Sequence, residues 1–209
     1  MTDNLDEIVE SSQAECLATG FDFTEGPVWQ PDGHLLFVDI RRSLIFRLAP
    51  GGQPEVVREN SGGSNGLTFD LQGRLIMCEG DNRRVTRMEP DGTITTVADR
   101  WDGKLLNRPN DVIYRSDGSV YFTNPAGQMV SPEREMDSSG VHRVTPDGSV
   151  SLLISDLGFP NGLALSPNER TLYVANTREP ALINAYGLNP DGSIANGRLF
   201  ADMSSDEPD

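Results

Sequence analysis

Apolar and polar residues alternate in short runs along most of this chain, and turn sequences separate the runs. Residues 34–39 read His-Leu-Leu-Phe-Val-Asp, and residues 119–123 read Ser-Val-Tyr-Phe-Thr. Pro-Asp-Gly begins at residues 31, 90, 146 and 190, and Ser-Asp-Gly begins at residue 116. A period of two is typical of a β-strand, and Asp-Gly between two such runs favours a hairpin because glycine tolerates a positive φ. The pattern therefore predicts an all-β protein built from hairpins.

A longer unit also recurs about every 45 residues. Its copies begin near Phe-Thr-Glu-Gly-Pro-Val-Trp at 23–29, Ser-Asn-Gly-Leu-Thr-Phe at 64–69, Arg-Pro-Asn-Asp-Val-Ile at 108–113 and Phe-Pro-Asn-Gly-Leu-Ala at 159–164. Each copy leads into two hairpins, and four strands in about 45 residues is the unit of a β-propeller blade. A β-sandwich also has evenly spaced turns, but the similarity between whole units favours the propeller.

One polar residue opens each unit, and these residues form a series along the chain: Glu25, Asn65, Asn110, Asn161 and, in the terminal Glu-Pro-Asp, Asp209. If each unit opens with the innermost strand of a blade, their side chains approach the central axis together. Carboxylate and amide oxygens are the ligands that Ca²⁺, Mg²⁺ or Mn²⁺ prefers. The alternative is a turn role, and Asn-Gly at 65–66 and 161–162 is typical of turns. For Asn65 the turn is favoured, whereas for Glu25 the ligand role is favoured, because an acid flanked by strand-forming residues has little reason to lie there without a partner.

Composition narrows the classes of function. The 209 residues carry a formal charge of −15, from 17 lysines and arginines and 32 acids. Five of the acids lie within residues 1–15 and four within 202–209, so the acidity is concentrated at the ends. Such a charge disfavours nucleic acid as a partner, and no apolar run is long enough for a membrane span. The N-terminus lacks the basic and apolar regions of a secretory signal, so a cytoplasmic location is expected.

These motifs resemble the SMP-30/gluconolactonase/luciferin-regenerating-enzyme family. The resemblance rests on Glu-Gly-Pro-Val-Trp at 25–29, Arg-Pro-Asn-Asp at 108–111, Ser-Val-Tyr-Phe-Thr at 119–123, Phe-Pro-Asn-Gly-Leu at 159–163 and Pro-Asp at 208–209. It implies a six-bladed propeller with one divalent cation in its central channel. The cation expected first is Ca²⁺, with Zn²⁺, Mn²⁺ or Mg²⁺ as alternatives. Two stretches depart from the family pattern, namely Cys-Glu-Gly-Asp at 78–81 and Thr-Asn-Pro at 123–125, and both put the substrate preference in doubt.

The resemblance also implies individual roles. Glu25, Asn161 and Asp209 resemble the metal ligands, and Asn110 resembles a residue that is a fourth ligand in some members and a substrate contact in others. Arg108 resembles a substrate-binding residue, and Asp209 resembles the catalytic acid/base. The implied activity is hydrolysis of a sugar-type or other small lactone. His34 and His142 are expected on exposed faces without a catalytic role.

Two other functions stay open on the same scaffold. One is a phosphotriesterase-like hydrolase, and the other is a non-catalytic calcium-binding propeller. For the domain organisation, the sequence predicts an acidic extension over 1–18 and an incomplete propeller over 19–209. The incomplete propeller is expected to hold about four blades and the start of a fifth, since a six-bladed ring needs roughly 90 further residues at about 45 per blade.

Overall fold

The computed structural model describes residues 11, 13–127, 134–178 and 180–204. Within these ranges the chain forms β-strands and no helix, which confirms the all-β prediction. No helix long and apolar enough to cross a membrane occurs in the described part. Residues 1–10 of the predicted acidic extension lie outside it, and the first strand begins at Thr24.

Sixteen of the strands form four antiparallel sheets of four, and each sheet takes its strands in chain order. The first sheet contains β1 (Thr24–Gln30), β2 (His34–Asp39), β3 (Leu44–Leu48) and β4 (Glu55–Arg58). The second contains β5 (Ser64–Phe69), β6 (Leu75–Glu79), β7 (Arg84–Met88) and β8 (Ile94–Ala98). The third contains β11 (Val112–Tyr114), β12 (Val120–Asn124), β13 (Gly140–Val144) and β14 (Val150–Ile154). The fourth contains β15 (Pro160–Leu165), β16 (Thr171–Asn176), β17 (Leu182–Leu188) and β18 (Ile194–Asp202). The short strands β9 (Arg100–Trp101) and β10 (Lys104–Leu105) pair between the second and third sheets.

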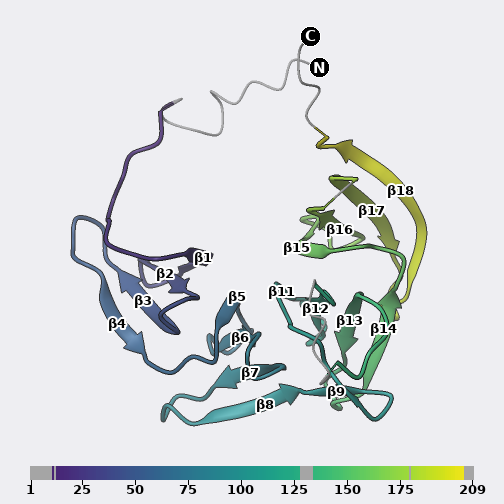
Figure 1. Ribbon diagram of the computed structural model, residues 1–209, viewed down its shortest axis with the longest axis horizontal. Helices are drawn as coiled ribbons and strands as arrows, with labels where there is room; N and C mark the ends of the chain where they lie inside the picture. The colour runs from purple at the N-terminus through teal and green to yellow at the C-terminus, as the bar shows by residue number, and fades with distance from the viewer. Residues whose placement is uncertain (1–10, 12, 128–133, 179, 205–209) are drawn as a thin grey trace.

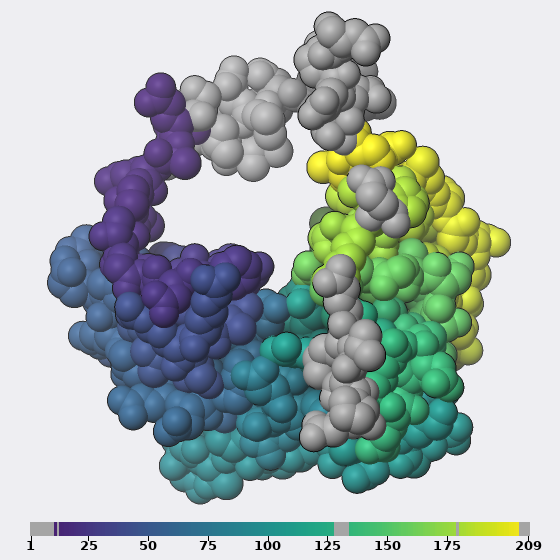
Figure 2. Space-filling view, viewed as in Figure 1, coloured from purple at the N-terminus to yellow at the C-terminus, as the bar shows by residue number. Residues whose placement is uncertain are grey.

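The four sheets follow one another around a common centre, as the blades of a propeller do (Figure 1). The first strand of each sheet, β1, β5, β11 or β15, lies nearest the centre, and the fourth strand lies at the outside. The space-filling view shows the described residues curving around this centre (Figure 2). The prediction that each repeat opens with the innermost strand is therefore correct, although Asn110 lies just before β11 rather than within it.

The hydrophobic cores lie between neighbouring sheets. One cluster joins the first and second sheets through buried side chains such as Val38, Ile45 and Met77. Equivalent clusters join the second sheet to the third and the third to the fourth. A blade is apolar on both faces because each face packs against a neighbour, so burial along β6 and β12 is continuous rather than alternating.

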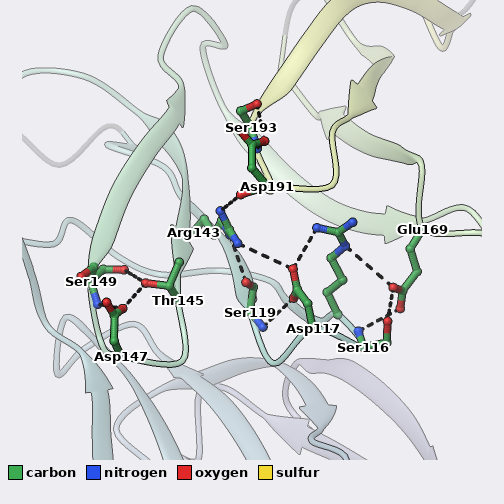
Figure 3. A network of polar contacts seen from close by, with 11 residues as sticks. Ser116, Asp117, Ser119, Arg143, Thr145, Asp147, Ser149, Glu169, Asp191 and Ser193 are labelled. Atoms are coloured by element: carbon green, nitrogen blue, oxygen red, sulfur yellow. Dashed lines mark hydrogen bonds and ion pairs between the residues drawn. The ribbon is translucent and has the colours of Figure 1, made fainter.

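A polar network at the hairpin turns adds to the contact between the third and fourth sheets (Figure 3). Glu169 accepts hydrogen bonds from the backbone amide and the hydroxyl of Ser116, at 3.0 and 2.5 Å. Arg143 donates to the hydroxyl of Ser119 at 3.0 Å and to the backbone oxygen of Asp191. Asp117 lies 3.6 Å from the Arg143 guanidinium. Charged side chains at these turns therefore form hydrogen bonds across the boundary between the two sheets.

The expected exposure of His142 is wrong. Its side chain on β13 is fully buried, stacks on Phe122 with ring centroids 5.2 Å apart, and meets the edge of Trp101 at 5.7 Å. Neither ring nitrogen has a hydrogen-bond partner. Burial lowers the pKa of His142 to about 4, because the charged form would lose its hydration. Alternation along a strand does not predict this position, since both faces of a blade are covered.

Candidate metal and substrate site

Three of the four innermost strands share a local irregularity at the predicted site residues. The register of β1 shifts between Glu25 and Val28, that of β5 between Ser64 and Leu67, and that of β15 between Pro160 and Leu163. A β-bulge bends the strand and re-aims a side chain, and such bulges are frequent beside active sites. The repeated motif therefore encodes a bulge on the strand nearest the centre.

The glycine after the polar residue allows neighbouring inner strands to approach closely. Gly26 has a φ of 54°, and a Cβ there would lie 1.9 Å from the backbone oxygen of Asn65. A Cβ on Gly66 would lie 2.5 Å from the Cα of Asp111. The Gly66 amide also donates to the backbone oxygen of Asn110 at 2.7 Å. Only glycine fits these contacts. Asn65 and Gly66 lie within strand β5, so the favoured turn role of Asn65 is wrong.

Thr123, on β12, connects the third blade to the fourth. Its backbone oxygen accepts the Asn110 amide at 2.9 Å, and its hydroxyl accepts the Asp111 amide at 2.9 Å. The same hydroxyl donates to the backbone oxygen of Asn161 at 2.8 Å. Contacts between inner strands thus run from Glu25-Gly26 through Asn65-Gly66 and Asn110-Asp111 to Asn161-Gly162, as the sequence series predicts.

Asn110 carries a sign of an absent binding partner. Its side-chain oxygen is buried and accepts no hydrogen bond. A buried polar atom without a partner is unfavourable by about 1–3 kcal/mol, so such atoms are rare and call for an explanation. A cation bound at this oxygen would supply the missing contact.

Glu25 and Asn161 flank Asn110 in the series. The Glu25 carboxylate is half-buried, and its hydrogen bond in the structure comes from the adjacent Gly26 amide at 3.3 Å. The amide nitrogen of Asn161 donates to the Thr177 hydroxyl at 3.3 Å. Glu25 and Asn161 therefore offer oxygen ligands from β1 and β15, on either side of Asn110. This donor set fits a hard divalent cation.

Asp111 is a functional candidate that the sequence analysis did not single out. Its carboxylate accepts the backbone amide of Leu163 at 2.8 Å and that of Val112 at 2.9 Å. Burial raises the pKa of Asp111, the two amides oppose this rise, and the negative charge of Glu25 adds to it. Asp111 stands where the other repeats carry glycine, and that exception within the repeat is the signal that could have revealed it.

Arg108 and Asn110 line a cleft of about 240 Å³. Arg108 is partly exposed and donates to Asp81 at 2.5 Å. Asp81 belongs to the 78–81 stretch that departs from the family pattern, so this departure orients an arginine at the cleft. The structure thus places the predicted substrate residues Arg108 and Asn110 together.

Two further observations concern the predicted metal ligands. Asp209, the predicted catalytic residue and fourth ligand, lies outside the described residues. Among the residues that the structure describes, no group of three or more His, Cys, Asp or Glu side chains could hold a metal ion. A ligand set with two asparagines and one described carboxylate does not form such a group, so this result leaves the predicted set untested.

Comparisons with known proteins place most of the chain in one family. The sequence profile described as the SMP-30/Gluconolactonase/LRE-like region matches residues 23–209. A gluconolactonase of Zymomonas mobilis is 32% identical over an alignment that covers 90% of this chain and 59% of the relative. A solved gluconolactonase of Xanthomonas campestris is 33% identical with a TM-score of 0.80, over 88% of this chain and 64% of that one. A calcium-binding protein, regucalcin, of Agrobacterium tumefaciens has a TM-score of 0.73 over 90% of this chain and 62% of that one, at 18% identity.

The arrangement of antiparallel four-stranded sheets around a common centre is that of a propeller-type protein. The chain belongs to the SMP-30/gluconolactonase/LRE-like family. It spans 59% of the length of the Zymomonas relative and 64% of the Xanthomonas structure.

Proposed function

We propose that the protein hydrolyses a sugar-type or other small lactone and needs a divalent cation to do so. The observation that carries the proposal is the buried, unpartnered side-chain oxygen of Asn110, two residues before the inner strand β11 of a gluconolactonase-like fold. Gluconolactonases among the relatives support the substrate class. The calcium-binding neighbour supports Ca²⁺ as the first cation to test.

In this proposal Glu25, Asn110, Asn161 and Asp209 hold the cation. When bound, a divalent cation supplies Lewis acidity, which polarises a carbonyl and stabilises negative charge on its oxygen. Asp209 enters from its Pro-Asp motif alone, because it lies outside the described residues.

The chain's own groups then act on the substrate and on water. Arg108 donates hydrogen bonds to ring hydroxyls of the lactone at the cleft, since its guanidinium presents several N–H donors in a fixed plane. Asp209 accepts the proton of the attacking water and returns it to the alkoxide that leaves when the ring opens. Atoms balance, because one water adds across the ester bond to give the hydroxy acid.

We also retain the six-bladed ring as part of the proposal. Four described sheets would be two thirds of such a ring, and the chain spans a similar share of the gluconolactonase relatives. The predicted domain bounds, an extension over 1–18 and an incomplete propeller over 19–209, stay predictions.

The proposal is tested by the rate of lactone hydrolysis, followed by acid release, with and without a chelator. The expected result is hydrolysis of an aldonolactone that the chelator abolishes and that Ca²⁺, Mn²⁺, Zn²⁺ or Mg²⁺ restores. Asn161→Ala removes the proposed ligand from β15. Asn168→Ala, in a turn at the far end of the fourth blade, is its matched control. Activity that survives chelation would contradict the cation, and phosphotriester hydrolysis without lactone hydrolysis would favour the alternative enzyme.

A further inference from the structure

A second arginine lines the same cleft as Arg108 and has no place in the proposed reaction. Arg178 follows strand β16, and its guanidinium carbon lies 4.1 Å from the centroid of the Phe159 ring. Both Phe159 and Arg178 line the cleft. The described lining contains these two arginines and no acidic side chain.

The side chain of Asn176 holds the loop that carries Arg178. Asn176 is 5% exposed, and its amide oxygen accepts the backbone amide of Phe159 at 2.7 Å. Its amide nitrogen donates to the backbone oxygens of Arg178 and Pro180 at 2.7 and 2.8 Å. One buried side chain thus holds the backbone at Phe159 and at Arg178, and the stacking of the guanidinium on the ring further restricts Arg178 before a ligand binds.

The two arginines differ in their partners. Arg108 has the Asp81 carboxylate, whereas Arg178 makes no ion pair with any residue in the described part of the chain. Stacking on an aromatic ring uses the face of a guanidinium and leaves the N–H donors at its edge for an anion.

We propose that Arg178 binds a negatively charged group of the substrate, a carboxylate or a phosphate, while Arg108 contacts its hydroxyls. The substrate class is then a sugar lactone that carries an anionic group in addition to the reactive ester. The shared chemistry is bidentate recognition of an oxyanion by a planar guanidinium. This inference rests on the proposed lactonase function for its meaning, but the binding it requires can be measured without turnover.

The test is equilibrium binding to the full chain, measured by titration calorimetry with three unreactive probes. The probes are a neutral hexose, the matching hexuronate and the matching hexose 6-phosphate. The unmodified chain is expected to bind at least one anionic probe about tenfold or more tightly than the neutral sugar, as a charged hydrogen bond commonly gives. The uronate and the phosphate ester show which oxyanion the cleft accepts.

Arg178→Gln is expected to remove this preference without changing the affinity for the neutral hexose. Arg178→Lys, which keeps the charge but not the planar fork, should recover part of it. Arg170→Gln is the matched control, because Arg170 is exposed in the turn before β16, at the other end of the fourth blade. Thermal unfolding of each variant checks that the fold is unchanged.

Equal affinity of the unmodified chain for the three probes would overturn the inference, and so would a preference that Arg178→Gln retains. A preference that Arg170→Gln removes equally would also overturn it, because the effect would then come from overall charge. These outcomes are separate from the proposed function. If no lactone is hydrolysed, the proposed function fails while the binding preference is still measured.

Discussion

The two ends of the third blade differ in how their polar groups are paired. The pairing of Val112 with Phe122 and of Tyr114 with Val120 places Asn110 at one end of the β11–β12 hairpin and the Ser116–Asp117 turn at the other. At the turn, Asp117 accepts a hydrogen bond from Arg115 at 2.9 Å and lies within ion-pair distance of Arg143 (Figure 3). At the opposite end, the side-chain oxygen of Asn110 has no partner.

The difference separates groups that stabilise the fold from groups that await a ligand. Polar atoms whose partners are supplied by neighbouring blades gain little from a ligand and lose much when a partner is removed. A buried atom without a partner costs stability until something binds to it. The contrast between the partnered carboxylates at the turn and the unpartnered oxygen of Asn110 therefore distinguishes the proposed site from the turn network.

The largest expected effect follows from replacing a carboxylate at the unsaturated end. Glu25→Gln should lower lactone hydrolysis by about 100-fold or more, because even residues that only support a metal ligand commonly change activity by 10- to 100-fold. The rate constant at saturating cation concentration is the measurement. Glu169→Gln makes the same chemical change at the turn network and should keep the rate within about twofold. Similar losses in both variants would remove the distinction.

Glu79 is a fully buried carboxylate whose hydrogen bonds are all made, although it pairs with Ser64 and so lies close to the inner-strand series. It therefore serves as a partnered counterpart to Asn110. Burial would raise the pKa of Glu79, but its hydrogen bonds outweigh this and lower the pKa; their donors are Asn82, Arg58, Arg84 and Thr86. Glu79→Gln should lower the free energy of unfolding by about 3 kcal/mol at pH 7, because two arginines lose their carboxylate.

The stability that the Glu79 charge contributes depends on pH. A carboxyl with a lowered folded-state pKa contributes stability above its ordinary value of 4.5, and this contribution is lost as pH falls through the folded-state pKa. The stability difference between the parent and Glu79→Gln, measured by urea unfolding, should therefore shrink below pH 4.5. A difference independent of pH would show that the charge of Glu79 is not what stabilises the fold.

His142 also lacks a hydrogen-bond partner, but unlike Asn110 it is enclosed by aromatic side chains on the third strand of its blade. Its pKa of about 4 lies below the ordinary 6.5, so the unfolded chain binds the proton first. Stability should fall as pH drops from about 6.5 to 4, by on the order of 3 kcal/mol. His142→Leu should flatten this slope in urea unfolding without altering hydrolysis at pH 7.5. A pH profile of activity that changes with His142→Leu would contradict its purely structural role.

The smallest expected effect lies in the turn network. Asp117→Asn removes a charge shared by Arg115 and Arg143, and it should lower the free energy of unfolding by about 1 kcal/mol, since the pairs are partly exposed. Chemical denaturation measures the change, which 0.5 M salt should reduce. A loss of lactone hydrolysis greater than the loss of stability explains would link the two ends of the blade.

The sequence predicts the parts of this molecule that repeat. Strand alternation and Asp-Gly turns predict the hairpins, and the series from Glu25 to Asn161 predicts the inner strands, because the same local motif opens each blade and forms a bulge in three of the four. Features that depend on a single partner far along the chain escaped prediction. The burial of His142 depends on Trp101, the role of Asn65 depends on the close approach of Gly26, and Arg178 gains its setting from Phe159.

The most direct test of the central claim is the cation affinity of Asn110→Leu, compared with that of the parent chain by titration calorimetry. If the buried amide oxygen is a ligand, the parent binds one divalent cation and Asn110→Leu binds it at least about tenfold more weakly. In chelator the variant should unfold at the same or a higher temperature, because an unpartnered buried polar group has been removed. Unchanged cation affinity, or no cation binding by the parent, would contradict the account.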